Sequence, residues 1–132
     1  MAIILFKLPV PSTGFLEDAS FQMLGGRTCC IACPINETIV LNLIFGEVEG
    51  FRCTYYKACS LDMIDAYDKV VDIGLSEWLR AIQTQLTTSG GNAVDLRHLQ
   101  IYFDDGPCYE FICRSFHSEP PSFPIPPREP WL

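Results

Sequence analysis

The residues most able to do chemistry lie in one predicted hairpin, Leu96–Phe116, which brings a histidine toward a cysteine. Two runs rich in aromatic and β-branched residues flank the turn sequence Asp-Asp-Gly-Pro, and Asp-Gly between such runs predicts a β-hairpin. With the turn placed there, Phe103 pairs with Cys108 and His98 pairs with Cys113. A thiol beside an imidazole is the minimum for nucleophilic catalysis. Because no third orienting group accompanies them in the sequence, we expect a structural pair and assign no catalytic residue.

The same register sorts the hairpin side chains onto two faces, because successive residues of a strand point to opposite sides. One face is apolar and is expected to form core; it carries Leu99, Ile101, Phe103, Cys108 and Ile112. The other face is too aromatic for plain solvent surface; it carries His98, Gln100, Tyr102, Tyr109, Phe111 and Cys113. Since aromatic residues are enriched in interface cores, we predict a binding surface at this hairpin. Its candidate residues are Tyr102, Tyr109, Phe111, Asp104, Glu110, His98 and Cys113.

Acidic residues are the second notable feature of the hairpin. Glu110 falls on the otherwise apolar face, where a carboxylate must lie near the rim, pair with a base such as Arg97 or Arg114, or serve a function. Asp104 most simply serves the turn, because aspartate tolerates turn geometry and bonds to nearby backbone.

Seven cysteines raise the questions of redox chemistry and metal binding. The CxxC within Cys29–Cys33 is followed by Pro34, so it lacks the helix N-terminus that lowers the pKa of a redox-active cysteine. A zinc site needs four ligands. The candidate set has unsuitable spacing, because its second pair is six residues apart instead of three: Cys30, Cys33, Cys53 and Cys59. We expect reduced, mostly buried thiols, with no metal and no cofactor.

Composition limits the classes of protein that the chain can belong to. With 132 residues, 48% of them hydrophobic and 19% charged, it fits one globular domain. The net charge of −7 argues against a nucleic-acid partner, and the longest apolar run is too short to span a membrane. The first residues have no basic leader. We therefore expect an acidic, cytoplasmic protein that meets neither nucleic acid nor membrane.

The elements that must position the hairpin are mostly strands. Alternation and turn residues predict strands at Ala2–Leu8, Phe21–Leu24, Thr28–Cys33, Thr38–Phe45 and Phe51–Lys57. Ser76 is a good N-cap for a helix over Ser76–Leu86. The segment Leu61–Ile73 fits helix and strand equally; as a helix it would align Asp62, Asp65, Asp68 and Asp72. We predict an α+β fold, a mainly antiparallel sheet of five to seven strands with one or two helices packed on one face.

The C-terminal segment differs in composition from the rest of the chain. Residues 118–132 hold six of the ten prolines and should be extended. They contain PxxP followed by Arg128, a pattern that recognition domains accept. A strap in which Phe123, Ile125 and Trp131 dock on the protein itself or on a second subunit is the favoured alternative. The predicted organisation is a single domain over 1–117 with a proline-rich tail over 118–132.

Two segments together resemble a known class of proteins. Ser-Glu-Trp-Leu at 76–79, followed about 20 residues later by His-Leu-Gln-Ile-Tyr-Phe-Asp-Asp-Gly-Pro-Cys-Tyr-Glu-Phe-Ile-Cys at 98–113, resembles small uncharacterised bacterial proteins. Some of these look like the immunity proteins of polymorphic toxin systems. The resemblance covers about half of the chain, Phe45–Phe116. It implies an α+β sheet-and-helix domain that masks a toxin, and it brings no catalytic residues.

Three functions remain open on the sequence. The leading expectation is a non-enzymatic small binding protein, an immunity-type inhibitor of a basic toxin, because the chain is acidic and the hairpin face aromatic. One alternative is a small Cys/His-site enzyme or metal-binding protein. The other is a structural subunit that self-associates as a homodimer through the aromatic face and the tail.

Overall fold

The structure is a computed structural model that describes residues 2–104 and 106–122. Within these residues the chain forms nine strands in two antiparallel sheets, two α-helices and two short 3-10 helices. The strands are β1 (Ile3–Lys7), β2 (Ser20–Leu24), β3 (Thr28–Pro34), β4 (Val40–Gly46), β5 (Gly50–Thr54), β6 (Lys69–Asp72), β7 (Arg97–Tyr102), β8 (Cys108–Cys113) and β9 (Ser115–Ser122). The helices are η1 (Ser12–Gly14), η2 (Tyr56–Ala58), α1 (Leu61–Ile64) and α2 (Glu77–Thr88).

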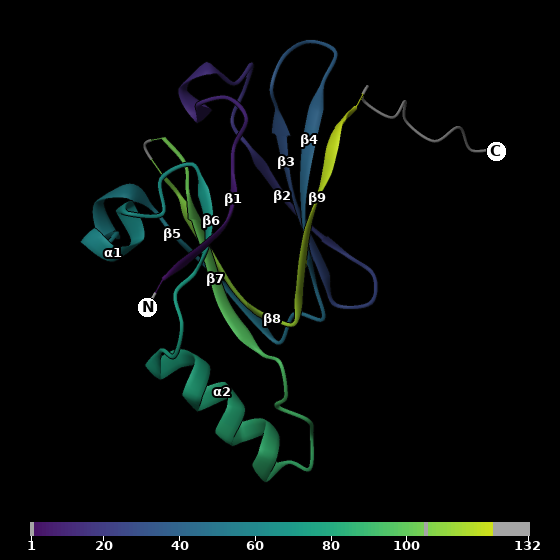
Figure 1. Cartoon of the computed structure of the whole chain (residues 1–132), viewed down its shortest axis with the longest axis vertical. Helices are drawn as coiled ribbons and strands as arrows, with labels where there is room; N and C mark the ends of the chain where they lie inside the picture. The colour runs from purple at the N-terminus through teal and green to yellow at the C-terminus, as the bar shows by residue number, and fades with distance from the viewer. Residues whose placement is uncertain (1, 105, 123–132) are drawn as a thin grey trace, which may run out of the picture.

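The two sheets face each other as layers of a sandwich (Figure 1). The five-stranded sheet has the order β1-β6-β7-β8-β5 and the four-stranded sheet has the order β2-β3-β4-β9. Aromatic contacts show which edges lie opposite each other: Phe6 of β1 is 6.1 Å from Phe116 of β9, and Phe21 of β2 is 5.0 Å from Phe51 of β5. Each edge strand therefore packs on an edge strand of the other layer.

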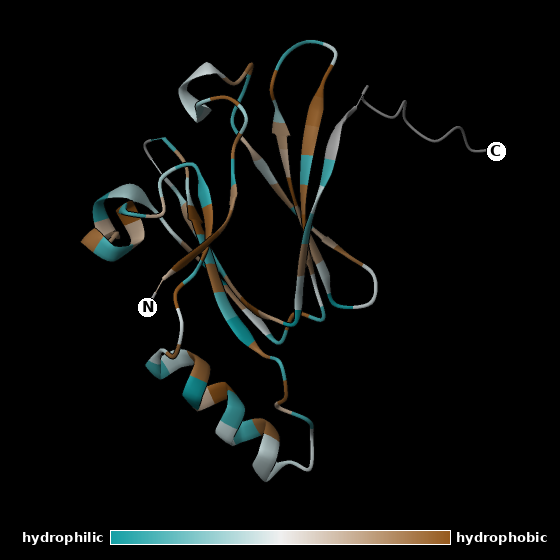
Figure 2. Ribbon diagram, viewed as in Figure 1, coloured by the Kyte–Doolittle hydropathy of each residue, from teal (hydrophilic) through white to brown (hydrophobic). Residues whose placement is uncertain are grey.

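The core lies between the two inner faces. Burial alternates along β4, as expected for a strand with one face covered, and the apolar residues of the central strands gather in the sandwich (Figure 2). At its centre the rings of Phe45 and Phe111 stack with their centroids 3.9 Å apart. The buried residues of this cluster are Cys29, Ile31, Cys33, Leu41, Leu43, Phe45, Val48, Val70, Leu99, Ile101, Phe103, Phe111 and Cys113.

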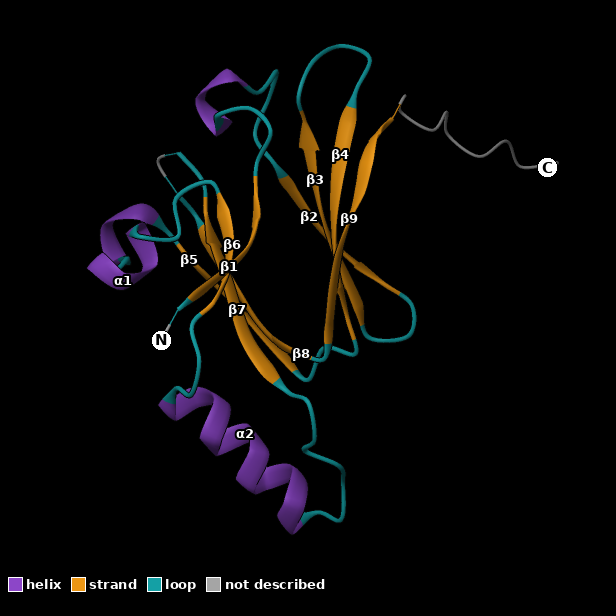
Figure 3. Cartoon of the chain, viewed as in Figure 1, coloured by secondary structure: helices purple, strands orange, loops and turns teal. Residues whose placement is uncertain are grey.

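Both α-helices lie on the side of the five-stranded sheet that faces away from the core (Figure 3). The N-cap predicted for α2 is confirmed, since Ser76 Oγ accepts the backbone N–H of Leu79 at 3.0 Å. Leu79 packs on Leu96 and on Ile112 of β8. The α+β fold with helices on one face is confirmed. The described residues form nine strands where five to seven were expected, and these divide into two sheets where one was expected.

The ambiguous segment Leu61–Ile73 contains both of the expected elements. It begins as α1, capped by Ser60, and then becomes β6. The four aspartates of this segment consequently do not share one helical face, and only Asp62 and Asp65 lie on or beside α1.

The pairing register predicted for the hairpin is wrong by one residue. Tyr102 pairs with Cys108, and Arg97, instead of His98, lies opposite Cys113. Five residues separate the paired residues Tyr102 and Cys108, whereas the predicted turn had four residues between its paired strands. A shift of one residue in the register moves every side chain of a strand to the other face. Phe103 stays in the core while the loop folds back, with the Gly106 N–H donating to the Phe103 carbonyl at 2.8 Å.

The boundary expected between residues 117 and 118 falls inside β9. This strand pairs with β4 as far as the Ser122–Val40 position. Prolines are tolerated there because β9 is an edge strand. The rest of the predicted tail, including the strap residues and the PxxP pattern, lies outside the described residues. In the described part of the chain, every helix is too short or too polar to cross a bilayer.

The corrected register predicts which phenylalanine supports the fold. Replacing Phe111, which is fully buried on the inner face, with alanine should lower the free energy of unfolding by about 3–5 kcal/mol. Phe51→Ala removes the same side chain from a position that is 41% exposed, so its loss should be less than half as large. Urea unfolding followed by circular dichroism measures both values, and equal losses would contradict the observed register.

Candidate functional site

A row of directly paired residues crosses the outer face of the five-stranded sheet and forms the floor of the candidate site. In order from β5 to β1 the row is Arg52, Glu110, Gln100, Val71 and Ile4. Its β5–β8–β7 half is polar and its β6–β1 half is apolar. The space above the row is correspondingly divided into two adjoining clefts.

The polar cleft has a volume of about 580 Å³ and lies between α1 and α2. The sheet provides its floor, α1 with its cap provides one wall, and the start of α2 provides the other. Its lining residues are Arg52, Ser60, Asp62, Met63, Ile73, Ser76, Glu77, Trp78, His98, Gln100 and Glu110.

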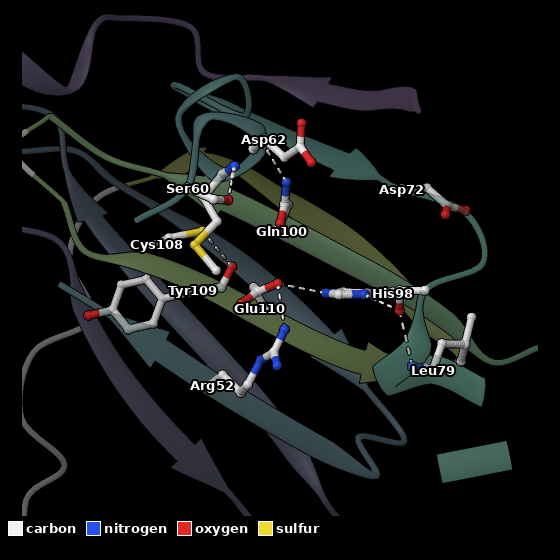
Figure 4. A network of polar contacts seen from close by, with 12 residues as sticks. Arg52, Ser60, Asp62, Asp72, Leu79, His98, Gln100, Cys108, Tyr109 and Glu110 are labelled. Carbon is white, nitrogen blue, oxygen red and sulfur yellow. Dashed lines mark hydrogen bonds and ion pairs between the residues drawn. The ribbon is translucent and has the colours of Figure 1, made fainter. Parts of the chain in front are cut away.

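Glu110 is the centre of the polar cleft (Figure 4). Only 1% of the residue is exposed. Its Oε1 accepts hydrogen bonds from His98 Nε2 at 2.8 Å and from Arg52 Nη2 at 3.2 Å. Its Oε2 is buried and has no hydrogen-bond partner within the described structure. A buried carboxylate oxygen without a donor is costly, so this atom can still gain free energy from an added donor.

Two neighbours keep the Glu110 carboxylate ionised. Burial raises its pKa, but the hydrogen bonds from His98 and Arg52 and the positive charge of Arg52 outweigh that effect. The pKa of Glu110 therefore lies below its ordinary value of 4.5. An ionised carboxylate only accepts hydrogen bonds, which assigns the proton of the first contact to His98 Nε2.

His98 connects this carboxylate to α2. Its Nδ1 lies 2.7 Å from Ser76 Oγ, and that oxygen already accepts the N–H of Leu79. The hydrogen of the Ser76 hydroxyl is then free to be donated to Nδ1 of a neutral ring. Glu110, His98 and Ser76 thus form one continuous chain of hydrogen bonds from the sheet to the helix.

Trp78 closes the polar cleft on the α2 side. The guanidinium carbon of Arg52 lies 4.0 Å from the centroid of the indole ring, a distance suited to a cation–π contact. The same indole meets the His98 ring edge-on, with centroids 5.1 Å apart and planes at 86°. The tryptophan therefore restricts both of the donors that hold Glu110.

The apolar cleft adjoins the polar one and has a volume of about 600 Å³. The two share four lining residues, which are Asp62, Ile73, Ser76 and Gln100. Ile4, Val71 and Leu75 add an apolar surface, and Leu75 is 67% exposed. Together the two clefts form a single trough that has one charged end and one apolar end.

The structure brings only two of the seven predicted binding residues together, His98 and Glu110. Phe111 and Cys113 lie in the core, and Tyr109 faces the four-stranded sheet, where it stacks on Phe21 at 5.7 Å. The prediction that these three belong to an outer face with His98 is therefore wrong, because the register shift reverses the faces of β8.

The remaining two predicted binding residues also lie away from the polar cleft. Tyr102 is on the outer face as expected, but it is buried with Ala66 and Val71. Asp104 is exposed at the hairpin turn and accepts from the Tyr67 hydroxyl at 3.5 Å. Neither residue lines the polar cleft.

The cysteines lack the surroundings of reactive thiols. Cys30 and Cys33 are separated by an odd number of positions on one strand, so they point to opposite faces of β3. Burial raises the pKa of Cys33 and of Cys113 to about 12, which disfavours the thiolate. Cys113 also faces the core while His98 faces the helices, so the predicted pair does not form. Among the described residues, no group of three or more His, Cys, Asp or Glu is arranged to hold a metal ion.

Sequence reasoning missed three residues of the site: Arg52, Ser76 and Trp78. Ser76 is predicted as a helix cap and Trp78 falls within the same predicted helix, but neither position predicts contact with the hairpin. Arg52 carried the alternating pattern of a half-exposed strand and nothing more. Placing it beside Glu110 requires the β5–β8 pairing.

The comparisons with known proteins do not identify the chain: no family model, no curated protein and no solved structure matches it.

The lowered pKa of Glu110 predicts a stability that depends on pH. A carboxyl with a lower pKa in the folded state stabilises the fold above its unfolded pKa, and this contribution disappears as the pH falls through the folded value. Glu110→Gln should lower the free energy of unfolding near pH 7 by about 1–3 kcal/mol. The difference between wild type and variant should shrink below pH 4.5.

Urea unfolding from pH 3 to pH 8 tests this expectation. Glu37→Gln is the matched control, because Glu37 is exposed and its substitution should leave the curve unchanged. A Glu110→Gln deficit that persists unchanged at pH 3 would contradict an ionised, stabilising carboxylate.

Proposed function

We propose that this chain is a binding protein whose polar cleft receives a positively charged side chain of a partner protein. The observation that carries the proposal is the Oε2 of Glu110, a buried carboxylate oxygen that lacks a donor on a residue that lines the cleft. A guanidinium or ammonium group supplies that donor together with a compensating charge.

The charges around the trough favour a cationic occupant. Its lining contains four carboxylates and two basic side chains; they are Asp62, Asp65, Glu77 and Glu110 against Arg52 and Lys69. The net charge of the whole chain, −7, has the same sign. Complementary fields accelerate encounter with a basic partner and select against acidic ones.

Arg52 already demonstrates how a guanidinium fits this site. It stacks on Trp78 and donates to Glu110, yet 46% of its side chain is exposed and it makes a single contact with one carboxylate oxygen. A partner arginine that contacts Oε2 would complete the pairing from the other side, with Asp62 at the rim. Buried aromatic and arginine contacts of this kind provide much of the binding energy of protein interfaces.

The class of partner that suits these properties is a basic toxin, and the chain would then act as its immunity-type inhibitor. The resemblance of residues 76–79 and 98–113 to immunity proteins supports this class. Blocking a toxin requires only tight binding and no catalytic step. Self-association as a homodimer remains a prediction, since no contact described above bears on it.

Binding of a small cationic probe tests the site directly. N-acetyl-L-argininamide should shift the NMR signals of the Trp78 indole and of Glu110 at millimolar concentrations, whereas N-acetyl-L-leucinamide should not. The double variant Asp62→Asn/Glu77→Gln should weaken binding several-fold, and added salt should weaken it further because the contacts are partly exposed. Glu37→Gln should bind as the wild type does.

Two results would refute the cleft as a cation site. One is the absence of any shift at the cleft with the arginine probe in a folded protein. The other is an unchanged affinity in the double variant. At the level of the partner, a basic protein retained by wild type and by Glu37→Lys should be lost by Asp62→Lys/Glu77→Lys; equal retention would show that the partner binds elsewhere.

A further inference from the structure

The serine at the start of α2 stands in the position of an activated nucleophile. Ser76 Oγ lies 2.7 Å from His98 Nδ1, and His98 Nε2 lies 2.8 Å from Glu110 Oε1. The carboxylate fixes the ring proton on Nε2, so a neutral ring turns its lone pair toward the Ser76 hydroxyl. Acid, imidazole and serine follow one another in the order that activates serine in acyl transfer, with the two ring nitrogens exchanged.

We propose that Ser76 is a nucleophile activated by His98, and that the trough hydrolyses a small carboxylic ester. Glu110 is the positioning residue, because it contacts His98 and orients its ring. This activity does not require the cation binding proposed above, although both involve the same chain of hydrogen bonds.

The start of α2 supplies the electrostatic part of such a site. The helix has twelve residues, and the N–H groups of a first turn have no partner within the helix. The N–H of Leu79 donates to Ser76 Oγ, which favours a developing alkoxide. The amides of Glu77 and Trp78 belong to the same turn, where oriented N–H groups and the helix dipole stabilise an oxyanion.

The trough provides room for both parts of an ester. Ser76 lines both clefts, so this residue lies at their junction. The apolar cleft, with Ile4, Ile73 and Leu75 in its lining, suits an uncharged acyl chain. The polar cleft, which contains His98, suits the leaving alcohol that must receive a proton.

The reaction balances with water as the only co-reactant. Ser76 Oγ attacks the ester carbonyl carbon and its proton passes to His98 Nδ1. The carbon–oxygen bond to the alcohol breaks, and His98 returns the proton to the departing alkoxide. Water, deprotonated by His98, then attacks the acyl-serine, which releases the carboxylic acid and regenerates Ser76 with its proton.

Ser60 provides a natural control within the same cleft. It also caps a helix, accepting the Met63 N–H at 3.3 Å, and it also lines the polar cleft. Its hydroxyl has no histidine among its described partners. If capping alone made a serine reactive, Ser60 and Ser76 would behave alike.

Labelling with an alkyl fluorophosphonate tests the proposal. The reagent forms an oxygen–phosphorus bond to an activated serine, its phosphorus–fluorine bond breaks, and fluoride leaves while the serine proton passes to the base. Peptide mapping by mass spectrometry should place the label on Ser76 and not on Ser60. The protein should also release p-nitrophenol from p-nitrophenyl butyrate, and labelling should abolish that release.

Three variants make the outcome decisive. Ser76→Asp keeps an oxygen to cap α2 but should lose label and activity, and His98→Asn should slow labelling by about 10²- to 10⁴-fold. Ser20→Ala, on β2 of the other sheet, should label at the wild-type rate. An unlabelled Ser76 in folded protein, equal labelling of Ser60, or labelling unaffected by His98→Asn would each overturn the proposal. Because N-acetyl-L-argininamide binding is measured separately, either proposal can fail without the other.

Discussion

The rest of the site depends on the need to compensate one buried carboxylate. Glu110 is ionised on a sheet face that two helices partly cover, and an unpaired charge in such a place is expensive. Its compensation comes from both neighbouring strands, through Arg52 on β5 and His98 on β7. His98 in turn bonds to Ser76, so the same chain of hydrogen bonds connects the start of α2 to the sheet. A single requirement for donors thereby links three strands and a helix.

The register of the central hairpin makes this arrangement possible. With Gln100 opposite Glu110, the polar residues of β7 and β8 face the helices while Phe111 enters the core against Phe45. A slip of one residue would send the carboxylate into an aromatic core and expose Phe111 to the helices. The free-energy cost of burying the carboxylate and of moving Phe111 out of the core maintains the observed register. The same alternation places Ile112 against α2.

The two proposed activities draw on different ends of the same hydrogen-bonded chain. Cation binding uses the unpartnered Oε2 of Glu110 and the acidic rim of the polar cleft. Nucleophilic chemistry uses Oε1, which orients His98 toward Ser76. Trp78 serves both, because it packs against Arg52 and against His98. A buried polar network that is satisfied except at one oxygen is an unusual feature of a core and a common feature of a site.

The sequence by itself determined the local features of this protein. Alternating strands, the Ser76 cap and the hairpin at Leu96–Phe116 follow from short-range rules about periodicity, capping and turns, and all three were predictable. It did not determine the five-residue loop that sets the hairpin register, nor the pairing that brings Arg52 beside Glu110. Those depend on packing between segments that are distant in the chain. Only the tertiary structure could therefore replace the expected His98–Cys113 pair with the Glu110–His98–Ser76 chain, because the observed register places Phe111 in the core and turns Glu110 and His98 toward the helices.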